Sequence, residues 1–134
     1  NDEIVMVCPE GHKLAELSSL NWTDFAGEEL IVPCRGTGNR LLLDETMARA
    51  GLSISWSYEI RRSTTALELV AAGMGLALLP KSAIDPNKIN AVEIRTISNP
   101  SIIRPIGLLK RIGHKPTVAE EVFMSIICRV ATEI

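Results

Sequence analysis

The alternation of apolar and polar positions divides the chain into short strands and helices. Continuous apolar runs, typical of strands covered on both faces, occur at residues 4–8, 30–32 and 76–79. Between the last two runs, apolar residues recur at helical spacing over 39–50 and again over 63–72. This order of strand, helix, strand, helix and strand predicts an α/β fold.

Glycine and proline positions indicate where these elements end. Gly51 is placed to end the first helix, and Gly73 can adopt the left-handed conformation after the second. Pro80 removes a backbone donor and ends the strand before it. Residues 54–60 alternate and predict a further strand, and a hydroxyl-rich run at 63–65 is expected to open and cap the second helix.

The last third of the chain combines two further predicted strands with an apolar helix. Strands are expected over 91–97 and 102–109, and a capping box of Thr117 and Glu120 is expected to open the helix. The helix carries a wide apolar stripe made of Val118, Val122, Phe123, Ile126, Ile127 and Val130. Because such a stripe is too wide to face water, we expect the helix to pack against another surface, such as a second copy of the chain.

Composition suits one compact domain and argues against several functional classes. The chain has 134 residues, 46% of them hydrophobic, which is enough for a real core. The net charge is -2, and the absence of a long basic run argues against direct DNA binding. No apolar stretch approaches the roughly 18 residues of a membrane span, so no membrane partner is expected. The three cysteines are widely spaced, and we expect them to be reduced in a cytoplasmic protein.

The loop after the strand at 30–32 has the composition of a site for a small anion. Arg35 offers a planar donor for a carboxylate, and Gly36 and Gly38 allow close backbone approach. Thr37 adds a hydroxyl, and the start of the following helix favours an anion. The alternative is an ordinary glycine-rich turn with Arg35 in solvent.

Ser63 and Thr64, at the start of the second helix, form the second candidate wall of this site. Hydroxyls at a helix start often cap it, so capping is the alternative to ligand contact. Arg61 and Arg62 precede them, and strand alternation predicts that at most one of the two points toward the ligand.

Catalytic chemistry is not indicated. Cys8 and His12 could be imagined as a nucleophile and a base, but no orienting third group is evident. Neither His12 nor His114 has a second ligand at metal-binding spacing. We therefore expect no enzyme activity, no catalytic residue, no cofactor and no metal.

Four motifs occur in a fixed order along the chain. They are GHKLA at 11–15, DFAGEELI at 24–31, RLLLD at 40–44 followed by AG at 50–51, and LVAAGMGLALLP at 69–80. Together they resemble the effector-binding domain of LysR-type bacterial transcriptional regulators. The first motif departs from that family's usual pattern, with lysine where proline is common.

The resemblance implies a type II periplasmic-binding-protein-like fold. One lobe would be complete, with a mixed, mostly parallel sheet and helices on both faces. On this interpretation residues 1–8 are a crossing strand from the first lobe, 9–100 are the second lobe, and 101–134 are the returning strand and C-terminal helix of the first. The first half of the first lobe and an amino-terminal winged helix-turn-helix are expected to be absent.

The resemblance also implies a function. The domain would sense a small effector, often a carboxylate or other anion, in the cleft between the lobes, and the crossings near 8–9 and 99–100 would flex. It would control DNA binding through an attached domain outside this chain, within a dimer or tetramer. The implied contacts are the candidates at 35–38 and 63–64. A transporter's solute-binding protein and an assembly fragment without ligand are the alternatives.

Overall fold

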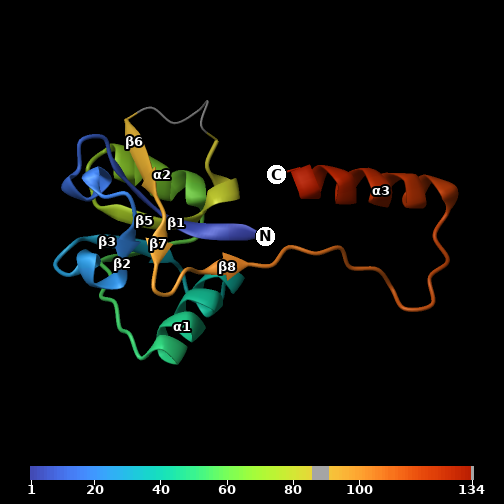
Figure 1. Cartoon of the computed structure of the whole chain (residues 1–134), viewed down its shortest axis with the longest axis horizontal. Coiled ribbons are helices and arrows are strands. Elements are labelled where there is room, and N and C mark those ends of the chain that lie inside the picture. The colour runs from blue at the N-terminus through green and yellow to red at the C-terminus, as the bar shows by residue number, and fades with distance from the viewer. Residues whose placement is uncertain (86–90, 134) are drawn as a thin grey trace.

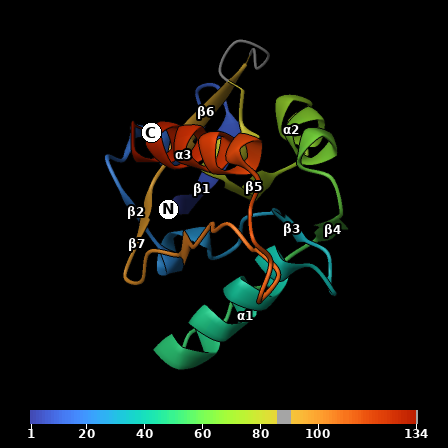
Figure 2. The same cartoon turned by 90° about the vertical axis from the view of Figure 1, so that its right-hand side faces the viewer.

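A mixed β-sheet forms the centre of the fold, with one helix on each of its faces (Figures 1 and 2). The computed structural model describes residues 1–85 and 91–133. The sheet has the order β4-β3-β5-β1-β6, and β8 pairs with the start of β1. The strands are β1 (Asp2–Pro9), β3 (Leu30–Pro33), β4 (Tyr58–Ile60), β5 (Leu76–Pro80), β6 (Val92–Arg95) and β8 (Ile103–Arg104). The predicted α/β class with a mixed sheet is confirmed.

Most strands of this sheet point in one direction, although three of its five described pairings are antiparallel. β3 runs parallel to both β4 and β5, whereas β1 runs antiparallel to β5, β6 and β8. β1 is therefore the strand that opposes the common direction. It lies inside the sheet, paired with β5 from Ile4 to Val7 and with β6 from Met6 to Pro9.

The continuous apolar runs are buried because successive side chains face opposite sides of the sheet. Met6 and Cys8 join the cluster that includes Leu43 and Met47 of α1 (Gly38–Ala50). Their neighbours Val5 and Val7 join the cluster that includes Ala66 and Val70 of α2 (Ser63–Ala71). Each helix therefore covers one face, as the resemblance implied.

The predicted helix ends are confirmed at three places. Gly51 and Gly73 follow α1 and α2 with left-handed φ values of 65° and 75°. At the last helix, α3 (Val118–Glu133), the Thr117 N–H donates to Glu120 Oε2 at 2.6 Å and the Glu120 N–H donates to Thr117 Oγ1 at 3.3 Å. This reciprocal pair is the expected capping box.

Three predicted strands are shorter than expected. The strand predicted at 54–60 is reduced to β4, because the segment before it meets β3 through the single bond from Ser57 N–H to Leu30 O, 2.9 Å long. The strand predicted at 91–97 divides into β6 and β7 (Ile97–Ser98), and β7 leaves the main sheet to pair with β2 (Leu20–Asn21). The strand predicted at 102–109 is only β8, since it pairs with just two residues of β1.

Short 3-10 turns fill the connections. They are η1 (Lys13–Glu16), η2 (Trp22–Phe25) and η3 (Lys81–Ala83). The Asp24 carboxylate accepts the Asn21 N–H at 2.7 Å, which caps the start of η2.

The chain after β8 leaves the sheet, and α3 stands apart from it (Figure 1). The apolar stripe of α3 is open to solvent, with Val118 at 78% and Phe123 at 63% exposure. The expectation that this stripe packs against another surface stays a prediction. Among the described helices, none is both long and apolar enough to cross a membrane.

Candidate functional site

The two candidate walls lie at one edge of the sheet. β3 and β4 are parallel neighbours, so their carboxyl ends meet at the same edge. The loop 34–37 leaves β3 there and enters α1, and residues 61–62 leave β4 and enter α2. In sheets of this type, ligands bind where strands end and helices begin.

A small pocket of about 40 Å³ lies between these connections. Thr37 and Ser63 both line it, so the structure brings these two candidates together. Arg61 and Arg62 both line it as well. That at most one of the two points toward the ligand stays a prediction, although β4 ends at Ile60 and strand alternation does not extend to Arg61.

Thr37 has a structural role in addition to its place in the pocket. Its hydroxyl donates to the Cys34 carbonyl at 2.8 Å and accepts the Arg40 N–H at 3.3 Å. Thr37 is therefore the N-cap of α1. The loop is shaped by this cap together with Gly36, whose φ is 81°.

Arg35 faces an acid of the protein itself. Its side chain is 77% exposed, and its Nε lies 3.7 Å from Glu59 Oε1. The Arg35 backbone N–H donates to Glu59 Oε2 at 3.3 Å. One of the backbone donors expected to face an anion is thus occupied by the Glu59 carboxylate.

The start of α2 differs from the expected hydroxyl cap. The N-cap residue is Arg62, which makes no capping bond with its side chain, and the first helical bond runs from Ala66 N–H to the Arg62 carbonyl. The predicted capping by residues 63–65 was therefore wrong. Ser63 is half-buried and Thr64 is exposed.

Arg40, which is buried, forms an ion pair with Glu59 on the surface, and the sequence analysis did not predict this pair. Arg40 is 3% exposed, with Nε 2.8 Å from Asp44 Oδ1 and Nη1 3.0 Å from Glu59 Oε1. The hydrogen bond from Arg40, helped by those from Arg35 N–H and Trp56 Nε1, holds the pKa of Glu59 below its usual value. Spacing of four residues could have indicated the pair with Asp44, but the contact with Glu59 depends on tertiary structure.

A second polar network borders the other side of the α1 start. Arg104 Nη1 donates to Asn39 Oδ1 at 3.2 Å, and Arg104 Nη2 lies 2.5 Å from Asp2 Oδ2. A pocket of about 500 Å³ lies beside this network, lined by Gly38, Asn39 and Arg104 among others. The start of α1 therefore lines both the pocket of about 40 Å³ and the pocket of about 500 Å³.

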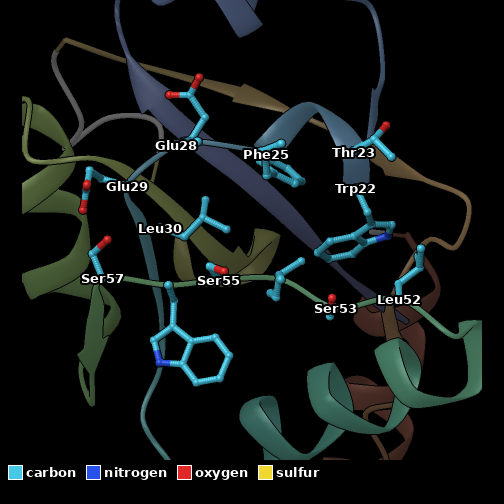
Figure 3. Close-up of a pocket in the computed structure, with 14 residues that line it drawn as sticks. Trp22, Thr23, Phe25, Glu28, Glu29, Leu30, Leu52, Ser53, Ser55 and Ser57 are labelled. Atoms are coloured by element: carbon cyan, nitrogen blue, oxygen red, sulfur yellow. The ribbon is translucent and has the colours of Figure 1, made fainter.

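A third pocket, of about 610 Å³, lies at the opposite end of β3 (Figure 3). Trp22, Phe25 and Leu30 line one side and residues 52–57 the other. Nothing in the sequence pattern indicated this pocket, since the two segments meet only in the folded chain. Within the part of the chain that the structure describes, no group of three or more His, Cys, Asp or Glu residues could hold a metal ion.

Comparison with known proteins gives one consistent result. The LysR substrate binding domain family model matches residues 1–131. The uncharacterized HTH-type transcriptional regulator YbhD of Escherichia coli (strain K12) is 29% identical over 99% of this chain and 42% of its own length. YybE of Bacillus subtilis (strain 168), described in the same words, is 31% identical over 81% of this chain and 36% of its own length. The chain thus spans less than half the length of these curated relatives.

Solved structures share the fold. The Synechocystis PCC6803 CcmR regulatory domain in complex with 2-PG has a TM-score of 0.75 and 19% identity, over 96% of this chain and 62% of that one. The effector-binding domain of QuiR in complex with shikimate has a TM-score of 0.72 and 21% identity, over 98% of this chain and 62% of that one.

Proposed function

This chain belongs to the LysR substrate-binding domain family, and on that premise we propose that it binds a small anionic effector where α1 and α2 begin. Its relatives are transcriptional regulators, so the transporter alternative is not favoured. We assign the site to Arg35, Gly36, Thr37, Gly38, Ser63 and Thr64.

One observation carries this proposal. Thr37 and Ser63, from different strand-to-helix connections, line one pocket at the edge where β3 and β4 end. The positive ends of two helix dipoles favour negative charge there, and Arg61 and Arg62 are among the residues that line the pocket. An effector carboxylate accepts hydrogen bonds from Ser63 Oγ and from backbone N–H groups at the start of α2.

Arg35 completes the site by exchanging partners. In this structure it lies near Glu59 at 3.7 Å with most of its side chain in water, so the pair is weak. An effector carboxylate offers Arg35 a bidentate partner instead. Differential affinity for two lobe arrangements then shifts their populations and reorients an attached DNA-binding domain. The lobes meet at the crossings near 8–9 and 99–100, and the domain acts in the cytoplasm without catalysis.

Isothermal titration with shikimate and a panel of mono- and dicarboxylates tests the site, with the corresponding amides as uncharged controls. Arg35→Ala and Ser63→Ala should each weaken the bound anion by about 1–3 kcal/mol. Arg49→Ala, which removes a side chain 83% exposed, is the matched control and should leave affinity unchanged. Thr37→Ser keeps the hydroxyl that caps α1 and should still bind the anion. Thr37→Ala removes that hydroxyl, so it should weaken anion binding and should also lower the free energy of unfolding by about 1 kcal/mol.

Two results would contradict this assignment. Equal affinity in Arg35→Ala, Ser63→Ala and the unchanged chain would place the anion elsewhere. Equal binding of the amides would show that negative charge is not what the site recognises.

The family assignment and the exposed stripe of α3 also support a homo-oligomer. Val122, Phe123 and Ile126 are 52%, 63% and 44% exposed, a larger contiguous apolar face than a soluble helix usually shows. Light scattering at micromolar concentration should detect a dimer or tetramer. Val122→Lys together with Phe123→Lys should yield the monomer with the sheet intact, and a chain already monomeric would refute the oligomer.

A further inference from the structure

The pocket at the start of β3 is separate from the effector site. It lies between η2, the residues leading into β3, and the segment 52–57. The effector candidates follow Pro33 at the other end of the same strand. A ligand in this pocket would therefore leave the starts of α1 and α2 free.

The apolar side of this pocket is closely packed. Trp22 and Phe25 are 5% and 4% exposed, and their ring centroids lie 5.7 Å apart. Trp22 Nε1 donates to the Pro100 carbonyl at 2.8 Å, which fixes the indole. Leu52 and Ile54, on the other side, pack against the same core. A surface held in this way is formed before any ligand arrives, which lowers the entropic cost of binding.

The charges around the pocket have one sign. Its lining includes two acids, Glu28 and Glu29, and no Lys, Arg or His. The Glu28 carboxylate is neutralised by Lys13 Nζ at 2.6 Å. Glu29 is exposed, and among the residues that the structure describes its carboxylate makes no ion pair. One uncompensated negative charge therefore remains at the pocket.

Glu29 and Trp22 lie at different ends of the pocket. Figure 3 shows Glu29 and Ser57 at one end and Trp22 and Leu52 at the other. Ser57 is fixed beside Leu30, the residue after Glu29, by its 2.9 Å bond to the Leu30 carbonyl. The Glu29 carboxylate therefore lies at the end of the pocket away from Trp22.

We propose that this pocket is a second ligand site, for a small organic amine with an apolar body. The ammonium group binds the Glu29 carboxylate and Ser57 Oγ, and the apolar body lies along Phe25 and Leu30 toward Trp22. The required ligand charge is opposite to that of the proposed effector, so the two sites select different molecules.

Binding of 2-phenylethylamine tests this site, with 2-phenylethanol and 3-phenylpropionate as neutral and anionic analogues of similar size. Titration followed by tryptophan fluorescence and by NMR shifts of the Leu30 and Ser57 amides should saturate with a Kd on the order of 1 mM. Glu29→Gln should weaken the amine about five- to tenfold. Glu16→Gln removes the same charge from the exposed turn η1 and should change nothing.

Two further variants separate this site from the effector site and from an interface. Ser55→Trp, which fills the groove at an exposed position, should abolish amine binding. Arg35→Ala should leave it unchanged, so failure of the effector site does not affect this test. The proposal is overturned if Glu29→Gln binds the amine normally, if the carboxylate analogue binds equally well, or if light scattering shows that Ser55→Trp instead disrupts an oligomer.

Discussion

Arg40 Nη1 and Glu59 Oε1 lie 3.0 Å apart and join the first turn of α1 to the edge strand β4. The guanidinium carbon of Arg40 also lies 4.2 Å from the centroid of the Trp56 ring. The Arg35 N–H donates to the same carboxylate, so the loop between β3 and α1 is held at both ends. This contact positions the proposed effector loop.

Removal of the Arg40 side chain should destabilise the fold. Arg40→Ala is expected to lower the free energy of unfolding by about 2–4 kcal/mol, because it leaves Glu59 and Asp44 without their shared cation and opens a buried space. Arg49→Ala, at an exposed pair 3.7 Å from Glu45, should cost less than about 0.5 kcal/mol. Urea unfolding followed by circular dichroism measures both, and equal losses would contradict the role of Arg40.

Asp2 should make stability depend on acid pH. Burial desolvates its carboxylate and by itself would raise the pKa, but bonds from Ser82 Oγ and N–H and from Arg104 outweigh burial and hold the pKa below 3.8. A lowered folded-state pKa contributes stability that is fully present above the unfolded value and is lost as pH falls through the folded value.

The Asp2→Asn variant isolates this contribution from those of other acids. The difference in unfolding free energy between the two proteins should be constant above pH 3.8 and should shrink below it. Urea titrations at several pH values measure it. A difference that does not change between neutral and acid pH would refute the role of the Asp2 charge.

Gly75 should be the least replaceable glycine of the turn between α2 and β5. A Cβ there would meet the Glu29 carbonyl oxygen at 2.3 Å, and that oxygen accepts the Leu76 N–H that aligns β5 with β3. Gly75→Ala should therefore cost about 2–4 kcal/mol. Gly73→Ala has open space and only a strained φ of 75°, so about 1 kcal/mol is expected. Denaturant midpoints compare them, and equal costs would argue against the steric contact.

The three cysteines should differ in reactivity toward a thiol reagent. Cys8 has no exposed surface, and burial, with Glu93 nearby, raises its thiol pKa. Cys34 is half-buried and Cys128 exposed. Mass spectrometry after brief labelling should find Cys128 modified first and Cys8 modified only on unfolding in urea. Rapid labelling of Cys8 in the folded chain would contradict its place inside the sheet.

Patterning predicted the elements that depend on local physics. The apolar runs at 4–8, 30–32 and 76–79 became β1, β3 and β5, because both faces of the sheet are covered and every position there is apolar. Gly51 and Gly73 ended their helices as expected. Predicted strand lengths were less accurate where a strand has few partners. The strand expected at 102–109 is only as long as its pairing with β1, so the neighbouring strand and not the segment's own pattern sets its length.

Faces of helices were predicted less well than their positions. Helical spacing predicts that Leu67, Val70 and Ala71 face inward from α2; Val70 is buried, but Ala71 is exposed and Ala66 is buried in its place. Helical spacing also places Ala50 on one face of α1 with Leu43 and Met47, yet Ala50 is exposed whereas the other two are buried. Small apolar residues fit either environment, so only packing against the sheet selects among them.

The sequence by itself determined the α/β class, the family and the glycines that end α1 and α2, because each depends on the order of residues along the chain. Tertiary structure alone decided that Thr37 and Ser63 line one pocket, that Glu59 binds Arg40, and that Glu29 and Trp22 share another pocket. Those contacts join segments brought together by strand order and direction. A pattern of single positions does not specify which distant partner a side chain will face.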